Sequence, residues 1–315
     1  MNTVDRKELL PAGIVTPLPL VERWKAVRAH IPSLKTLMVL FKVRIVILLL
    51  WAAVGGAFLA ANGWPGWGRL LLLLLTGGLA AGGSGAMNQY FERESDSLMK
   101  RTRHRPLVDG TIPRPGWVPY VAGGMIVVPS LLVLPFNPTL TFFLLLGAFI
   151  YVGLYTLYLK PRTLLNIVIG GAAGSAAVLS GSAAAGHWND PGALILSLLL
   201  FVWTPTHFWS LAIVHRADYA RSSTPMLPVQ TTDRVAALWV LLHTAATVFA
   251  AIALIFQPAL GWIYAVPVGL ASLDLLVRNI RLVRTPTPKL AFSLFKVSNI
   301  YLTVVMLMVG IDALL

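Results

Sequence analysis

Three polar side chains recur at four-residue intervals at the end of an apolar segment. Asn88, Glu92 and Asp96 follow the apolar stretch from 70 to 86, and residues four apart lie on one face of a helix. Mg²⁺ prefers such oxygen ligands and commonly bridges carboxylates to substrate phosphates. The spacing therefore predicts a magnesium site in which Asn88, Glu92 and Asp96 hold a phosphorylated ligand.

Basic residues follow this motif at once, between positions 99 and 106. Guanidinium groups bind phosphate through paired hydrogen bonds. We expect Arg101 and Arg105, which share helical phase, to contact phosphate oxygens. Lys160, at the end of another apolar segment, is a further candidate, and a membrane anchor is the competing role for such a lysine.

Two other candidates come later in the chain. Asp218, in a polar loop, is the natural partner for a second metal ion or for the other face of the same ion. His207 lies in an apolar segment between Trp203 and Trp209, and ionisable residues inside membrane segments are functional candidates. Either it contacts a large planar substrate or ligates iron, or it is a hydrogen-bonded packing residue.

The composition places these residues in a membrane protein. The 315 residues are 57% hydrophobic and 12% charged, with a mean hydropathy of +0.76, which excludes an ordinary soluble domain. Nine apolar runs are long enough to cross a bilayer as helices. They lie at about 36–61, 69–91, 116–134, 139–159, 164–186, 192–213, 235–256, 258–277 and 292–313. We therefore expect an all-α polytopic protein with nine transmembrane helices in one bundle. Glycines such as Gly83 and Gly174 are expected where these helices pack closely.

The distribution of basic residues predicts how the bundle is oriented across the membrane. With nine helices, all of the 25 Lys and Arg residues except Arg69 fall on one side of the membrane. Because basic loops stay in the cytoplasm, the N-terminus is expected inside, the C-terminus outside and the site at the cytoplasmic surface. The net charge of +13 then reflects topology and an anionic ligand, so no nucleic acid partner is expected.

The N-terminal segment differs from the rest. Residues 1–35 form a predicted cytoplasmic segment with an amphipathic interfacial helix, and residues 36–315 form the bundle. The segment lacks the apolar core of a cleavable signal peptide, and Asp5, Glu8 and Glu22 disfavour a mitochondrial transit peptide. A bacterial inner membrane is therefore favoured over a mitochondrial one. The chain has no cysteine, which excludes disulfides and thiolate metal sites.

With these motifs in view, the chain resembles the UbiA superfamily of intramembrane prenyltransferases, and within it the haem O synthase branch. The matching stretches are 88–96, 99–106, 166–171, 203–209, 218–228 and 291–298. The acidic motif marks only the superfamily, whereas the stretches 99–106 and 203–209 are specific to the haem branch.

The resemblance implies a reaction: transfer of a farnesyl group from farnesyl diphosphate to a vinyl group of haem b in the lipid bilayer, with addition of water, giving haem O and diphosphate. It implies Mg²⁺ held by Asn88, Glu92, Asp96 and Asp218. It implies Arg101, Arg105 and Lys160 on the diphosphate, and His207, Trp203 and Trp209 on the haem. Downstream partners would be haem A synthase or the assembly of a terminal oxidase.

The chain departs from the family pattern at several positions. Glu92 stands where the family usually has Asp, and Asp218 lacks a second acid four residues later. Changes across 174–183 keep open a superfamily enzyme whose acceptor is a quinone precursor or a chlorin. Further alternatives are a membrane transporter and a haem-handling assembly protein. Against a transporter, the charges crowd one surface rather than the middle of a helix.

Overall fold

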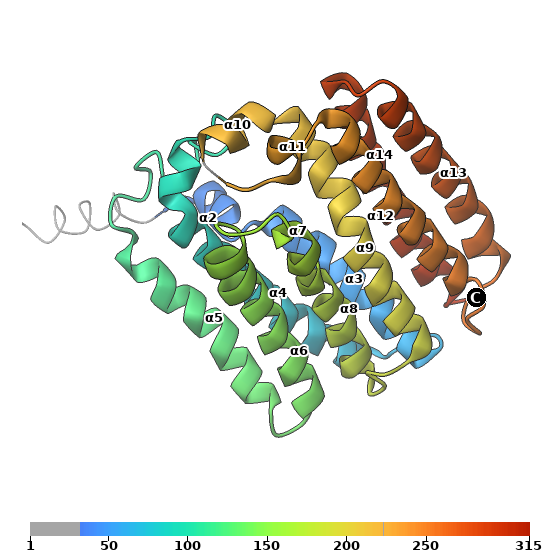
Figure 1. Cartoon of the computed structure of the whole chain (residues 1–315). Helices are drawn as coiled ribbons and strands as arrows, with labels where there is room; N and C mark the ends of the chain where they lie inside the picture. Colours follow the sequence, from blue (N-terminus) through green and yellow to red (C-terminus); the bar gives the residue numbers. More distant parts are fainter. Residues whose placement is uncertain (1–31, 223) are drawn as a thin grey trace, which may run out of the picture. The chain divides into compact units, whose positions relative to one another are not determined.

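The predicted apolar segments form helices in the computed structural model, which describes residues 32–222 and 224–315. Within these residues, nine helices are long and apolar enough to cross a membrane, and the same residues contain no strand. Residues 34–315 form one unit, in which the long helices run side by side (Figure 1). The chain is an integral multi-pass membrane protein. The expected interfacial helix falls on residues 1–31, outside the described part.

The long elements are α3 (Val43–Ala61), α4 (Trp67–Ser97), α5 (Val118–Val133), α6 (Pro138–Ala148) with the π-helix η2 (Phe149–Leu159), α7 (Asn166–Gly170) with α8 (Ala172–Ala185), α9 (Pro191–Val214), α12 (Asp233–Leu254), α13 (Trp262–Arg284) and α14 (Pro288–Asp312). The short elements are α2 (Leu34–Leu40), η1 (Pro115–Trp117), α10 (Arg216–Arg221) and α11 (Leu227–Gln230).

Local sequence explains where several helices begin. Asn137, Asp190, Thr232 and Thr287 each precede a helix, and each side chain accepts a hydrogen bond from a backbone N–H in the first turn. Such caps satisfy donors that have no partner within the helix. Proline follows three of these caps directly, where its fixed φ suits the first helical turn.

Two of the predicted boundaries that differ from the structure affect the candidate site. The segment 36–61 is not one helix, because the chain breaks between α2 and α3 at Lys42, whose φ is 51°. The segment 69–91 stops too early, since α4 continues to Ser97 and carries Glu92 and Asp96 on the same helix as Asn88. The continuation matters because it fixes the relative directions of all three side chains.

Glycine allows two close helix contacts. A Cβ atom on Gly83 of α4 would meet the Ala122 carbonyl of α5, and one on Gly181 of α8 would meet the Ala53 carbonyl of α3. Backbone atoms cannot move away as flexible side chains do, so these crossings require glycine. The packing role expected for Gly83 is therefore confirmed, and Gly181 has the same role.

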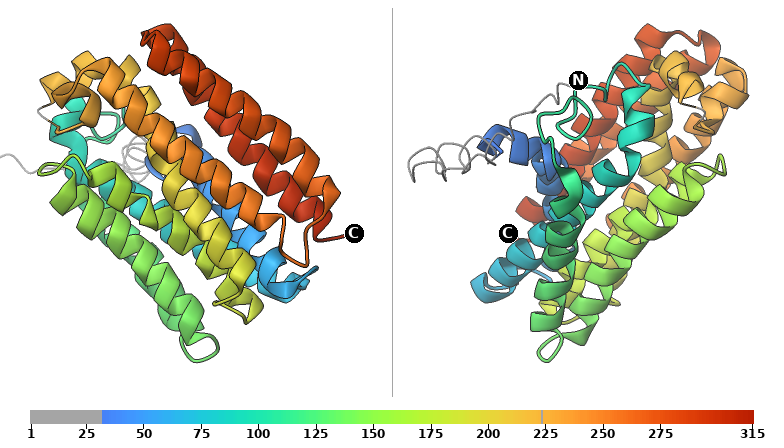
Figure 2. Two further views of the ribbon diagram at one scale, coloured as in Figure 1. Left: turned by 45° about the vertical axis from the view of Figure 1, so that its right-hand side comes forward. Right: turned by 90° about the vertical axis from the view of Figure 1, so that its left-hand side faces the viewer.

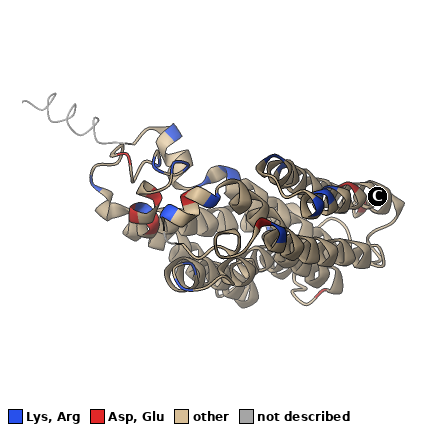
Figure 3. Ribbon diagram, turned by 45° about the horizontal axis from the view of Figure 1, so that its top comes forward, with Lys and Arg blue, Asp and Glu red and all other residues tan. Residues whose placement is uncertain are grey.

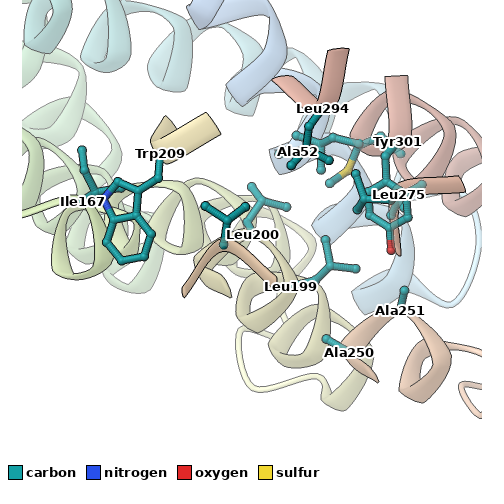
Figure 4. Packing of buried hydrophobic residues seen from close by; sticks show 14 of the residues in the cluster. Ala52, Ile167, Leu199, Leu200, Trp209, Ala250, Ala251, Leu275, Leu294 and Tyr301 are labelled. Atoms are coloured by element: carbon teal, nitrogen blue, oxygen red, sulfur yellow. The ribbon is translucent and has the colours of Figure 1, made fainter. Parts of the chain in front are cut away.

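The helices close around an apolar core. Helix α9 packs against α8, α12 and α14, and α14 also packs against α3. The largest cluster of buried apolar residues lies between these helices (Figure 4). Helix α4 packs against both α3 and α5. Figure 2 shows α10 and α11 at one end of the unit, together with the segment that follows α4. This end contains the candidate site.

Candidate active site

Helix α4 presents the three predicted ligands to the interior. The exposed fractions of Asn88, Glu92 and Asp96 are 2%, 8% and 1%. The α-helical period places residues four apart on one face, and at the end of α4 that face is turned inward. Buried carboxylates require cationic or metal partners, because removal from water without them is costly. Most charged residues visible in Figure 3 lie at this end of the unit.

Two of the three predicted cations contact these acids. Lys160 Nζ lies 2.6 Å from Glu92 Oε1. Arg105 donates a hydrogen bond to Asp96 Oδ2 and lies 3.9 Å from Glu92 Oε2. Lys160 comes from the end of η2 and Arg105 from the turns that follow α4, so three separate segments build the charged cluster.

The π-helix η2 aims several of its side chains at α4. Thr156 Oγ1 accepts a hydrogen bond from Asn88 Nδ2 at 2.9 Å, and Tyr151 and Lys160 also contact site residues. The wider turn of a π-helix brings residues four to five apart onto one face, and such segments occur frequently at functional sites. Tyr155 stacks on Tyr151 with ring centroids 5.8 Å apart, which adds an aromatic wall beside the acids.

Lys42 contacts the site, although the sequence patterns did not identify it as a site residue. Lys42 Nζ donates hydrogen bonds to Asn88 Oδ1 and, at 3.0 Å, to Tyr151 OH. The available signal was a lysine within a predicted apolar segment, which is a functional candidate by position. Its target was hidden, because the contact depends on the break between α2 and α3.

The acids of α4 fit a divalent cation. Among the described residues, Asp96 Oδ1 is buried and has no hydrogen-bond partner, and a carboxylate pair is the donor set that Mg²⁺ prefers. Asn88 Oδ1 already accepts from Lys42. No group of three acidic or histidine side chains in the described part of the chain converges on one ion position.

Asp218 belongs to a neighbouring polar group. It is buried on α10, contacts Arg221 and lies 3.8 Å from His215 Nδ1. Burial and the Arg101 charge lower the pKa of His215, so its ring is neutral at pH 7. A pocket of about 410 Å³ is lined by Lys100, Arg101, Val214, His215, Ala217 and Asp218.

Arg101 and Arg105 do not share a helix as predicted. The chain from 98 to 114 forms turns, so Arg105 reaches the acids of α4 whereas Arg101 faces the Asp218 pocket. Burial raises the pKa of Tyr219 on α10, and the Arg101 charge opposes that rise. The hydrogen bond from Arg221 Nε to Leu98 O, at 3.5 Å, joins α10 to the end of α4.

The three residues expected on a planar substrate separate into two groups. Trp203 and His207 stack with ring centroids 4.5 Å apart, and both contact Ser298 of α14. Trp203 Nε1 donates a hydrogen bond to the Ser298 carbonyl at 3.0 Å. His207 Nδ1 lies 2.9 Å from the Ser298 hydroxyl, within hydrogen-bond distance. Trp209 is buried within the core cluster that also contains Ile167 (Figure 4), whereas Trp203 is only partly buried against that cluster.

Comparison with known proteins decides the family. Residues 49–301 match the UbiA prenyltransferase family. The chain belongs to this family. It is 42% identical over 277 residues to the protoheme IX farnesyltransferase of Sulfolobus acidocaldarius, covering 88% of this chain and 95% of that protein. It is 40% identical over 270 residues to the protoheme IX farnesyltransferase of Alkalilimnicola ehrlichii, covering 84% of this chain and 87% of that protein.

Solved structures share the UbiA fold. A structure of digeranylgeranylglyceryl phosphate synthase superposes with a TM-score of 0.74 at 17% identity, covering 89% of this chain and 98% of the other. A UbiA homologue from Archaeoglobus fulgidus bound to DMAPP and Mg²⁺ gives 0.57 at 14% identity, covering 88% and 99%. At these identities the likeness concerns the arrangement of helices.

Proposed function

We propose that this UbiA family member transfers a farnesyl group from farnesyl diphosphate to a vinyl group of haem b, with addition of water, giving haem O and diphosphate. The observation that carries the proposal is the buried cluster in which Glu92 and Asp96 meet Lys160 and Arg105. Such a cluster suits a metal-bound diphosphate. The relatives named protoheme IX farnesyltransferase cover most of the chain and support the choice of donor and acceptor.

The diphosphate would lie against the end of α4. Glu92 and Asp96 would hold Mg²⁺, with Asn88 one turn deeper, and Asp218 would serve a second ion from its own pocket. When bound, the ion neutralises charge on the diphosphate oxygens. Arg105 and Lys160 stabilise the negative charge that grows on the diphosphate as its bond to C1 of the farnesyl group breaks. Arg101 approaches from the Asp218 side.

The haem would lie against α9 and α14. Trp203 and His207 form a flat surface held by Ser298, which suits a planar ring system. Apolar helices around the site exclude water from the allylic cation until a vinyl carbon of haem b attacks C1. Water then adds to the former vinyl group and releases a proton, which leaves a hydroxyl group. Trp209 would act only through packing.

The charged end of the bundle is proposed to face the cytoplasm, with the N-terminus inside and the C-terminus outside. Of the described basic residues that this topology assigns, only Arg69 lies at the other end. Relatives in bacteria and archaea favour the plasma membrane of a prokaryote over a mitochondrial membrane. Haem A synthase or a terminal oxidase under assembly would receive the product.

The test is expression in a host that lacks its own haem O synthase, followed by mass analysis of extracted haems. A haem heavier than haem b by one farnesyl group and one hydroxyl group is expected. An Asp96→Asn variant, produced at equal level in the same membranes, is the matched control. Haem b alone, with the wild-type chain present and folded, would contradict the proposed acceptor and direct the search to quinone precursors or chlorins.

A further inference from the structure

Lys42 sits in an uncommon backbone conformation. Its φ of 51° and ψ of 42° fall in the left-handed region, which a residue with a Cβ atom adopts at an energetic cost. Such conformations persist where surrounding structure holds them, and they concentrate at binding and catalytic sites. The break ends α2, starts α3 and turns the Lys42 side chain toward α4.

Helix α4 holds this break in place. Gln89 Nε2 donates hydrogen bonds to the Val39 and Leu40 carbonyls, at 2.7 and 2.9 Å, which satisfies acceptors at the end of α2. Gly85 leaves space, since a Cβ atom there would lie 3.3 Å from Phe41 O and 3.4 Å from Lys42 Cβ. The helix that carries the acids therefore also positions Lys42.

The Lys42 ammonium group can donate a further hydrogen bond to an anion. Of its three N–H bonds, the hydrogen bonds within the described residues use two, to Asn88 and Tyr151. Arg105, Glu92 and Asp96 lie close enough to act on its charge. Together, the three cations Lys42, Arg105 and Lys160 lie around the two carboxylates Glu92 and Asp96. An excess of like charge in a partly buried cluster is unfavourable without a counter-anion.

We propose that Lys42 binds the diphosphate of the prenyl donor and that Gln89 is its positioning residue. The inference rests on the proposed function and adds two residues to its donor site. Lys42 comes from the start of α3 and Lys160 from the end of η2, so two separate segments would supply cations to the diphosphate. Gln89 acts through the backbone break and does not itself contact substrate.

The experiment measures binding of radiolabelled inorganic diphosphate with Mg²⁺ to the purified full chain in detergent. Lys42→Met is expected to weaken binding about 10- to 100-fold, the effect of one hydrogen bond to a charged group. Lys35→Met removes an exposed lysine of α2 and should stay within about twofold of wild type. Lys42→Gln keeps a donor for Asn88 and replaces Lys42→Met if that variant does not fold.

Gln89→Met tests the positioning role. Like Lys42→Met, this variant should weaken diphosphate binding. The double variant Lys42→Met with Gln89→Met should bind diphosphate no more weakly than Lys42→Met alone, because Gln89 acts through Lys42. A Gln89→Met variant that loses thermal stability yet binds diphosphate normally would overturn the positioning role.

The outcomes separate the inference from the proposed function. Unchanged diphosphate binding by Lys42→Met, beside a wild-type chain that makes haem O, would overturn the inference alone. If Lys42→Met weakens diphosphate binding but the wild-type chain makes no haem O, the inference is supported and the proposal that haem b is the acceptor is contradicted. A wild-type chain that does not bind diphosphate would overturn both.

Discussion

Lys160 Nζ lies 2.6 Å from Glu92 Oε1, and this ion pair joins the end of η2 to the last turns of α4. The two residues are far apart in the chain, and both side chains are largely buried. The wider turn of the π-helix η2 places Tyr151 and Lys160, about two turns apart, on one face, where Tyr151 contacts Lys42 and Lys160 contacts Glu92. A cation and an acid are thereby held together where a metal-bound diphosphate would lie.

Lys160→Met should lower kcat/KM for farnesyl diphosphate about 10- to 100-fold, because a charge-assisted contact to the leaving group is lost. The KM for haem should change little. Turnover assays in membranes at varied donor concentration measure both. Arg162→Met is the matched control, since Arg162 is exposed and donates to the Leu157 and Tyr158 carbonyls. An equal loss in both variants would contradict the prediction.

Asp96→Ala should reduce turnover by more than tenfold, since loss of a metal ligand costs several kcal/mol of transition-state stabilisation. The variant also leaves Arg105 without its main partner, so Asp96→Asn is measured beside it to preserve shape. Size-exclusion chromatography checks that both remain folded. A rate above about a tenth of wild type in both folded variants would show that Asp96 is not a metal ligand.

Chelation should stop the reaction. Treatment of purified protein with EDTA is expected to abolish haem O formation, and added Mg²⁺ should restore it, because the buried acids of α4 suit a hard divalent cation. Product is measured by chromatography before and after the metal is restored. Full turnover in excess chelator would rule out a required metal ion.

His207→Ala should raise the KM for haem about tenfold or more and leave diphosphate binding unchanged, since His207 contacts Trp203 and Ser298 rather than the acids of α4. Trp209→Phe is the comparison, because Trp209 is buried in the core. That variant should lower the unfolding temperature and leave the KM for haem unchanged. The opposite pattern would place the acceptor on the other face of α9.

Gly181→Ala should destabilise the bundle by about 1–3 kcal/mol, because the added methyl group meets the Ala53 backbone carbonyl. Gly124→Ala on α5 is the matched control, since a Cβ atom at Gly124 has nothing within 4 Å. Thermal unfolding in detergent compares the two. Equal unfolding temperatures for the two variants would mean that α3 and α8 move apart without cost.

The sequence by itself determined the helices and the face of α4 that carries the acids. Apolar length sets where a chain crosses a bilayer, and the α-helical period sets which of Asn88, Glu92 and Asp96 share a face. Both properties depend on residues close together in the chain. They could therefore be predicted without knowledge of any neighbouring helix.

Only the tertiary structure decided which distant side chains meet. Gln89 donates hydrogen bonds to the backbone carbonyls at the end of α2 and so stabilises the break at Lys42. No sequence pattern near Lys42 reveals this contact. Arg101 and Arg105 diverge because their segment forms turns. Trp209 is buried in the core, whereas Trp203 is only partly buried against it and donates to the Ser298 carbonyl, since packing fixes the rotation of α9. Contacts between helices depend on close packing of side chains, and that packing is settled only when all the helices are assembled.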